Sequence, residues 1–131
     1  MIGFDSNVLV RYLVKDDPHQ AQLALAIVRS RTALDPGWVS LPVLMELVWV
    51  LEHSYKQNKP ALIHVVERLL GSQDIVLERE AVVAGALRMF SSGSAGFSDC
   101  VIALLARAAG CDRVVTFDRF AARDAGMELL K

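Results

Sequence analysis

The chain has 131 residues, of which 53% are hydrophobic and 22% are charged. This length and balance predict one globular domain, residues 1–131, with a sizeable core, and exclude disordered and low-complexity proteins. The formal net charge of −1 excludes the overall basic surface typical of many nucleic-acid-binding proteins. If four acids were held at a metal ion, the remaining 11 would face 14 Lys and Arg, leaving an excess of positive charge elsewhere.

The composition also bears on compartment. Two cysteines are too few for a disulfide framework, and three scattered histidines lack the spacing of a zinc site. The apolar stretches on either side of Glu46 are too short to span a bilayer. Asp5 interrupts the N-terminal apolar run that a signal peptide needs. These features predict a cytoplasmic protein with no membrane partner.

Apolar runs and helix-start signals alternate along the whole chain. Asp17 followed by Pro18, an N-cap residue and then proline at the first helical position, is the clearest helix start. The predicted elements, in chain order, are a strand at Ile2–Asp5, a helix from Ser6 or Asn7, a helix from Pro18 to about Arg31, a strand at Trp38–Leu41, a helix from Pro42 to about Tyr55, a helix from near Pro60 to Gly71, a strand at Asp74–Glu78, helices at Arg79–Phe90 and Phe97–Ala109, a strand at Arg113–Phe117 and a short strand at Met127–Leu130. Strands separated by helices predict an α/β fold whose mostly parallel sheet is covered on both faces.

Four acidic side chains stand out by their surroundings: Asp5, Glu46, Asp99 and Asp118. Two of them end predicted strands, one lies in the first turn of a helix, and Glu46 interrupts "LPVLMELVWVL". Taken singly, each aspartate has a structural alternative as a helix cap or dipole partner, and Glu46 as an exposed helix position. Sites in parallel sheets form beyond the carboxyl ends of the strands. We expect the first and fourth strands to be neighbours, which brings Asp5 and Asp118 together.

Clustered carboxylates carry a chemical implication of their own. They repel one another and raise one another's pKa unless a cation compensates their charge. A hard divalent ion, Mg²⁺ with Mn²⁺ as a substitute, is the natural partner of several oxygen ligands. Such an ion activates water and binds phosphate. The four acids therefore predict a metal-dependent hydrolase of phosphodiesters.

The segments "FDSNVLVRYL", "LMELVWVLEHSY" and "FSDCVIALLARAAGCDRVVTFD", in that order, resemble a PIN domain, specifically a VapC-type toxin of a toxin–antitoxin pair. The resemblance covers nearly the full length and implies a PIN-like three-layer fold, with a parallel sheet of about five strands flanked by helices. It implies a Mg²⁺-dependent endoribonuclease whose products carry 5′-phosphate and 3′-hydroxyl ends. It also implies a small cognate antitoxin, and a homodimer or a higher assembly with that antitoxin.

The resemblance also assigns roles to the four acids. The family's acidic set matches Asp5, Glu46, Asp99 and Asp118 by position, and no position of the motif is broken. Asp5 and Asp99 are the expected direct metal ligands. Glu46 and Asp118 complete the site, directly or through bound water, and one of them orients the nucleophile.

Polar residues beside the acids are predicted to assist them. Ser6 keeps a hydroxyl after the first acid, where the family often has threonine, and Thr116 matches a hydroxyl two places before the last acid. Asn7 is grouped with them as an auxiliary residue. The hydroxyls either bond to carboxylates or metal-bound water, or serve only as a cap and a strand residue.

Basic residues near the motifs are candidates for holding the RNA backbone. Arg11, one turn after Asn7, and Arg119, directly after the last acid, are the predicted RNA-binding residues. Lys15 and Arg123 fit a solvated helix face better.

Other α/β families with acids at strand ends are excluded by single positions. A receiver domain needs a lysine after a late strand, where this chain has Asp118; a haloacid-dehalogenase phosphatase needs a second aspartate where it has Asn7. A dinucleotide-binding domain needs a glycine-rich turn after the first strand, and "DSNV" has none. Two alternatives stay open: a catalytically silent PIN-like binding module, and a metal-dependent DNA nuclease, since nothing in the sequence visibly reads the 2′-hydroxyl.

Overall fold

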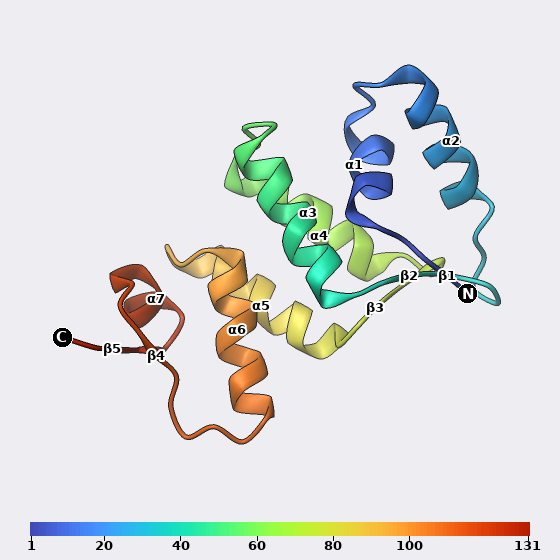
Figure 1. Cartoon of the computed structure of the whole chain (residues 1–131). Coiled ribbons are helices and arrows are strands. Elements are labelled where there is room, and N and C mark those ends of the chain that lie inside the picture. The colour runs from blue at the N-terminus through green and yellow to red at the C-terminus, as the bar shows by residue number, and fades with distance from the viewer. The chain divides into compact units, whose positions relative to one another are not determined.

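The computed structural model describes all residues, Met1–Lys131. The chain divides into two compact units, Met1–Glu78 and Arg79–Lys131, and each is described by itself. Strands and helices alternate along both units, as Figure 1 shows. No helix of the chain has both the length and the apolar character needed to cross a bilayer. That the whole chain forms one domain stays a prediction.

The first unit contains three short strands and four helices. Their bounds are β1 (Ile2–Gly3), α1 (Ser6–Val14), α2 (Pro18–Arg29), β2 (Gly37–Val39), α3 (Leu41–His53), α4 (Lys59–Gly71) and β3 (Ile75–Leu77). The strands form one parallel sheet in the order β1-β2-β3, in which Gly37 pairs with both Ile2 and Ile75. Because parallel strands run in one direction, the segments that follow them leave the sheet at the same edge.

Each helix of the first unit begins at a capping side chain. The caps are Asp5 for α1, Asp17 for α2, Ser40 for α3 and Asn58 for α4, and each side chain accepts a hydrogen bond from a backbone N–H of its helix. Proline occupies the first turn of α2, α3 and α4. A cap satisfies an N–H that has no partner inside the helix, and proline fits there because it has no N–H to satisfy. These local signals fix where the helices start.

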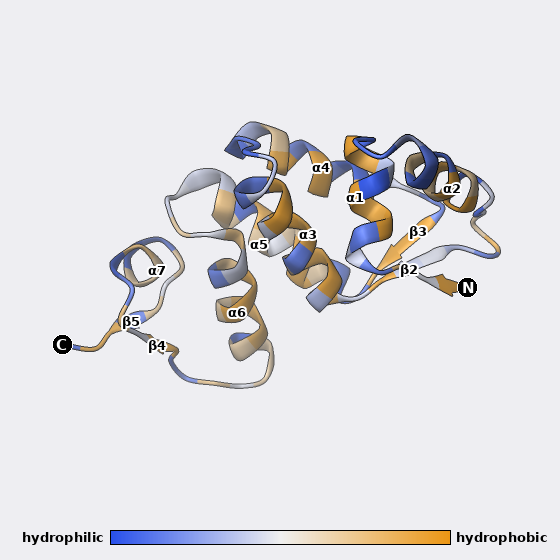
Figure 2. Ribbon diagram, turned by 45° about the horizontal axis from the view of Figure 1, so that its top comes forward, coloured by the Kyte–Doolittle hydropathy of each residue, from blue (hydrophilic) through white to orange (hydrophobic).

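Leucines and valines of α1, α3 and α4 fill the core of the first unit. The fully buried side chains are Leu9, Leu44, Leu47, Leu51, Leu62, Val39 and Val66. The strands β2 and β3 bury alternate residues, as in β3, where Ile75 and Leu77 are buried and Val76 is exposed. Figure 2 shows β3 as hydrophobic and α3 as a mixture of hydrophobic and hydrophilic residues. Glu46, Glu52 and His53 are exposed, so α3 has a polar, solvent-facing side in spite of its apolar sequence.

The second unit contains three helices and a two-stranded sheet. Its elements are α5 (Glu80–Ser92), α6 (Phe97–Ala108), β4 (Val115–Thr116), α7 (Arg119–Asp124) and β5 (Glu128–Leu129). Helices α5 and α6 pack together, and the rings of Phe90 and Phe97 meet edge to face at 5.8 Å. The strands β4 and β5 are parallel, and α7 is the crossover between them.

The predicted α/β fold with about five parallel strands is confirmed. Every predicted element is present, with strands shorter than expected, and α7 is an additional helix that the sequence analysis missed. The strands form a three-stranded and a two-stranded sheet, and the expected neighbours, the first and fourth strands, are not among the pairs. An apolar pattern specifies which face of a strand is buried but leaves open which strand lies beside it.

Truncation of a core leucine tests this account of the first unit. We expect Leu51→Ala, at a side chain with 0% exposure, to lower the free energy of unfolding by about 2–5 kcal/mol because it leaves a cavity. The matched control is Leu34→Ala, where the side chain is 99% exposed and burial is not lost. Urea unfolding of the three proteins measures both changes, and equal effects of the two substitutions would contradict the assigned core.

Candidate functional site

Asp5, Ser6 and Glu46 form one hydrogen-bonded group in the first unit. Asp5 Oδ1 accepts from the Ser6 backbone N–H at 2.7 Å, and Ser6 Oγ donates to Glu46 Oε1 at 2.7 Å. Ser6 is only 4% exposed and is the one buried polar residue of the chain, whereas both acids are exposed. Ser6 therefore links the end of β1 to the middle of α3 and holds two carboxylates beside one hydroxyl.

Each acid of this group keeps an oxygen that no protein group uses. Asp5 Oδ2 and Glu46 Oε2 have no hydrogen-bond partner, while the other oxygen of each carboxylate is fixed by Ser6. The geometry makes Asp5 the cap of α1, and its part in a metal site stays a prediction. Of the two alternatives for the Ser6 hydroxyl, the structure shows a bond to a carboxylate. A carboxylate with one oxygen fixed and one open suits a cation ligand.

Glu78 is a further acid at the same edge of the sheet, and the sequence analysis placed it only in a strand. It follows β3, and its Oε1 accepts from the Leu41 backbone N–H at 2.8 Å, at the start of α3. This carboxylate caps the helix that carries Glu46. The only sequence signal for it was its position after an apolar run, the same signal that marked Asp5.

Asp99 and Asp118 form the acidic pair of the second unit. Asp99 lies in the first turn of α6, as predicted, and is half-buried. Asp118 is the N-cap of α7, and its Oδ1 accepts from the N–H groups of Phe120 at 2.8 Å and Ala121 at 3.0 Å. Thr116 Oγ1 accepts from the Asp118 backbone N–H at 3.0 Å, so this hydroxyl positions the backbone of the acid and not its carboxylate.

The electrostatics of this pair are unfavourable for two bare charges. Burial raises the pKa of Asp99 above its usual value, and the nearby charge of Asp118 raises it further. The backbone N–H of Gly96 acts in the opposite direction and lowers the pKa of Asp99. The two carboxylates are thus close enough to repel each other. A bound cation is the ordinary remedy for this repulsion.

The donors in both units suit a hard divalent cation. They are carboxylate oxygens accompanied by a hydroxyl, the ligands that Mg²⁺ and Mn²⁺ prefer. Each unit supplies a pair of acids, and the structure contains no group of three or more His, Cys, Asp or Glu placed to hold a metal ion. A pair of carboxylates is enough for Mg²⁺, which commonly keeps several waters and takes one or two carboxylates from a protein.

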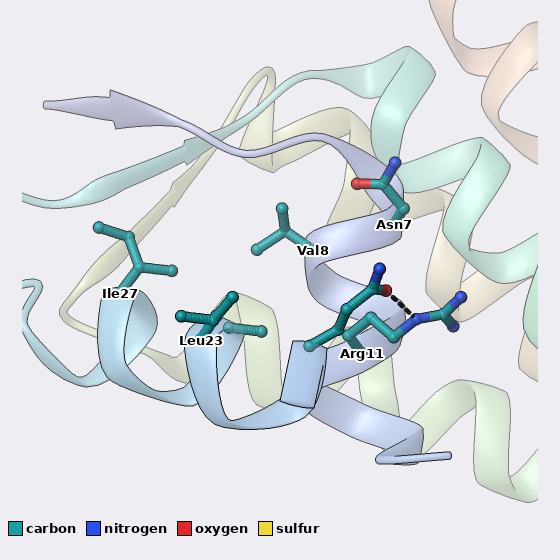
Figure 3. Close-up of a pocket in the computed structure, with 7 residues that line it drawn as sticks. Asn7, Val8, Arg11, Leu23 and Ile27 are labelled. Carbon is teal, nitrogen blue, oxygen red and sulfur yellow. Dashed lines mark hydrogen bonds between the residues drawn. The ribbon is translucent and has the colours of Figure 1, made fainter. Parts of the chain in front are cut away.

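A pocket of about 580 Å³ lies between α1 and α2 (Figure 3), and one of its lining residues, Asn7, directly follows Ser6 in the chain. Its apolar lining comes from Val8 on α1 and from Leu23 and Ile27 on α2. Asn7 and Arg11 add polar groups on the α1 side, and Arg11 Nε donates to Gln20 Oε1 at 2.7 Å. Asn7 is exposed and therefore available to a ligand.

The basic candidates differ in how far they are already engaged. Arg11 Nη1 lies 3.2 Å from both Asp16 Oδ1 and the Tyr55 hydroxyl, and Tyr55 itself donates to Asp16. Arg119 is exposed. Arg123 contacts Asp124 and Ser94, which agrees with a structural role. Of the two predicted RNA-binding residues, Arg119 has the charge that is free of an ion pair.

The pKa of Asp99 predicts how a neutral substitution changes stability. Because the pKa of Asp99 in the folded state lies above its usual value, the ionised side chain destabilises the fold at neutral pH. Below the usual aspartate range the side chain is protonated in both the folded and the unfolded state, and this destabilisation disappears. We expect Asp99→Asn to raise the melting temperature of the metal-free protein by a few degrees at pH 7, with the gain disappearing in acid. Calorimetric melting across pH measures this.

The matched control is Asp124→Asn, for which the sign is opposite. Hydrogen bonds from the Ser94 hydroxyl and backbone N–H lower the pKa of Asp124 below its usual value. Its ionised form therefore stabilises the fold above the usual aspartate range, and this contribution is lost as pH falls. Asp124→Asn should lower the melting temperature at pH 7. A shift of the same sign for both variants would contradict the assigned repulsion at Asp99.

The buried hydroxyl of Ser6 gives a second prediction. Ser6→Ala removes one intramolecular hydrogen bond and should lower the free energy of unfolding by about 1 kcal/mol. Ser92→Ala is the control, because its exposed hydroxyl bonds only to carbonyls of its own helix. That change should stay within about 0.5 kcal/mol. Denaturant unfolding compares them, and an unchanged Ser6→Ala protein would show that the Ser6–Glu46 bond contributes nothing.

Comparison with known proteins identifies the family of the chain. A VapC ribonuclease of Aquifex aeolicus (strain VF5) is 32% identical over 77 residues, which are 59% of this chain. The chain covers 57% of the length of that relative. A family model described as the PIN domain matches residues 2–125, a range that takes in all four candidate acids and parts of both units. The chain therefore belongs to the PIN-domain family.

Proposed function

We propose that this chain is a VapC-type toxin, a Mg²⁺-dependent endoribonuclease that hydrolyses RNA phosphodiester bonds. The observation that carries the proposal is the set of two acidic pairs in a PIN-domain chain. In one pair a buried hydroxyl holds Glu46 beside Asp5. In the other, burial raises the pKa of Asp99, and the charge of nearby Asp118 raises it further. The similarity to a ribonuclease named VapC supports the choice of RNA as substrate.

The four acids have distinct proposed roles. Asp5 in the first unit and Asp99 in the second would be direct metal ligands, while Glu46 and Asp118 would support them, directly or through bound water. Mg²⁺, when bound, compensates the carboxylate charges, activates water and stabilises negative charge on the phosphodiester. Mn²⁺, with the same preference for oxygen, is an expected substitute.

The remaining polar residues position these acids. The Ser6 hydroxyl fixes one oxygen of Glu46 and leaves the other open. Thr116 holds the backbone N–H of Asp118, whose carboxylate is oriented by two N–H groups of α7. Fixed carboxylates lose little freedom when they bind a cation, so preorganisation favours the site. Asn7 and Arg119 are the polar and basic groups proposed to meet the substrate.

The proposed reaction is hydrolysis with water as the nucleophile. Water adds to phosphorus, the bond from phosphorus to the 3′-oxygen breaks, and that oxygen takes up a proton. The products carry a 5′-phosphate and a 3′-hydroxyl. The 2′-hydroxyl is not the proposed nucleophile, because no histidine or lysine stands at the motif positions to activate it.

The proposed partners follow from the same assignment. They are the RNA substrate, a small cognate antitoxin, and a second copy of the chain in a homodimer or in a higher assembly with the antitoxin. The apolar pocket between α1 and α2, adjacent to Asn7 and Arg11, supports a protein partner near the first acidic group. A cytoplasmic location fits such a toxin and stays a prediction.

Cleavage of a mixed cellular RNA pool tests the proposal. The purified chain, freed of any co-purifying partner, should cut RNA with Mg²⁺ and not with EDTA. Asp5→Asn and Asp99→Asn should each lower the rate by more than about 100-fold, since loss of a ligand costs more than loss of a group that supports one. The product ends, mapped by ligation, should be 5′-phosphate and 3′-hydroxyl.

The matched control is Asp74→Asn, at an exposed aspartate outside both acidic pairs. It should cleave at the wild-type rate. Cleavage by Asp5→Asn at the wild-type rate would contradict the metal-ligand assignment. Parallel lanes with single-stranded DNA test the alternative of a DNA nuclease, which would cut DNA. If no lane shows cleavage and calorimetry detects no heat of Mg²⁺ binding, the alternative of a catalytically silent binding module is favoured.

A further inference from the structure

A second, smaller pocket in the first unit has a basic lining. Its volume is about 220 Å³, and its lining residues come from three helices: Tyr12, Leu13 and Lys15 from the end of α1, Leu25 and Arg29 from α2, and Arg68 from α4. No acidic residue lines it. It shares no lining residue with the pocket of Figure 3 and includes none of the candidate acids.

The three cations of this pocket, Lys15, Arg29 and Arg68, have no ion-pair partner. Four other arginines of the chain do pair with carboxylates: Arg11, Arg31, Arg113 and Arg123. The acids that follow Lys15 in the chain are engaged elsewhere, because Asp16 meets Arg11 and Tyr55 and Asp17 caps α2. The pocket therefore carries positive charge that the fold itself does not neutralise.

Helix dipoles explain part of this arrangement. Arg29 and Arg68 lie in the last turns of their helices, where a positive charge is favourable. Lys15 is the C-cap of α1 in the left-handed region, with φ 62° and ψ 34°, where glycine or asparagine is the usual residue. A dipole favours each charge on its own helix, but it does not bring three unpaired charges to one pocket.

We propose that this pocket binds the phosphate backbone of single-stranded RNA, outside the acidic site. The inference rests on the proposed ribonuclease function and extends its substrate contacts. Two guanidinium groups and one ammonium suit a run of phosphates, because Arg binds phosphate through paired N–H groups and Lys as a point charge. Tyr12, with Leu13 and Leu25, adds an aromatic and apolar surface on which a base stacks. The pocket holds RNA outside the acidic site while a bond at that site is cut.

Binding of a fluorescein-labelled single-stranded RNA to the full chain tests the proposal. Anisotropy is measured in EDTA and in the Asp5→Asn background, so that no cleavage interferes, over a range of salt. The combined variant Lys15→Glu, Arg29→Glu and Arg68→Glu should bind at least about tenfold more weakly at low salt. The slope of log affinity against log salt should fall by about 2, the value for three lost contacts to a single strand.

Two further variants guard against trivial results. Arg88→Glu, at another exposed helix arginine without an ion pair, should leave both the affinity and the slope unchanged. The combined variant Lys15→Gln, Arg29→Gln and Arg68→Gln removes the three charges without reversing them. It should lower the RNA affinity and the salt slope in the same direction, by smaller amounts. Circular-dichroism melting shows whether each variant is folded, and the Gln variant decides the matter if the Glu variant unfolds.

The outcomes separate this inference from the proposed function. Equal RNA binding by the Gln variant and the Arg88→Glu control would overturn the inference even if the wild-type chain cleaves RNA. Loss of RNA binding in the pocket variants would support it even if the wild-type chain cleaves nothing, in which case the proposed catalysis fails alone. If the variants lose affinity for poly-glutamate and keep their affinity for RNA, the pocket receives an acidic protein segment and the inference is wrong.

Discussion

The bond from the Ser6 hydroxyl to Glu46 is the contact on which the acidic end of the first unit depends. It joins residues 40 positions apart and is made by the one buried polar residue of the chain. Ser6 also donates its backbone N–H to Asp5, so one residue fixes an oxygen of each carboxylate. Because a buried hydroxyl without a partner is costly, the bond ties the packing of α1 on α3 to the placement of both acids.

The second unit positions its two acids without a bridging hydroxyl between them. Here both acids lie at the start of a helix, Asp99 in the first turn of α6 and Asp118 as the cap of α7. The Thr116 hydroxyl accepts a hydrogen bond from the Asp118 backbone N–H. Helix N-termini favour negative charge, yet the pKa of Asp99 is still raised by burial and by Asp118. The local dipoles are therefore insufficient to offset the repulsion, and a cation that binds both acids would remove it. Under the proposed function, the metal-free protein gives up stability for a site that would bind a divalent ion.

Local signals in the sequence predicted most of the fold and part of the site. Caps such as Asp17, prolines in first turns and apolar runs located the helices and strands, because these features act within a few residues. The helix α7, although a cap had been considered as an alternative for Asp118, was missed because its six residues are too few to show a helical period. The Ser6–Glu46 bond was foreseen as a possibility, whereas the bond from Glu78 to Leu41 was not, since contacts between distant segments leave no local pattern. The order of the strands in the sheets could not be predicted from the sequence for the same reason.

The distribution of charge explains why a net charge of −1 is compatible with an RNA substrate. The four candidate acids lie in two pairs, where a divalent ion would neutralise them, so they would not oppose the approach of a polyanion once the metal is bound. Several arginines form ion pairs with carboxylates of the fold. The cations of the pocket formed by α1, α2 and α4 form no ion pair, so the local electrostatic field there is positive although the net charge of the chain is negative. The proposed affinity for RNA thus depends on which charges remain unpaired, and the net charge of the whole chain does not reveal them.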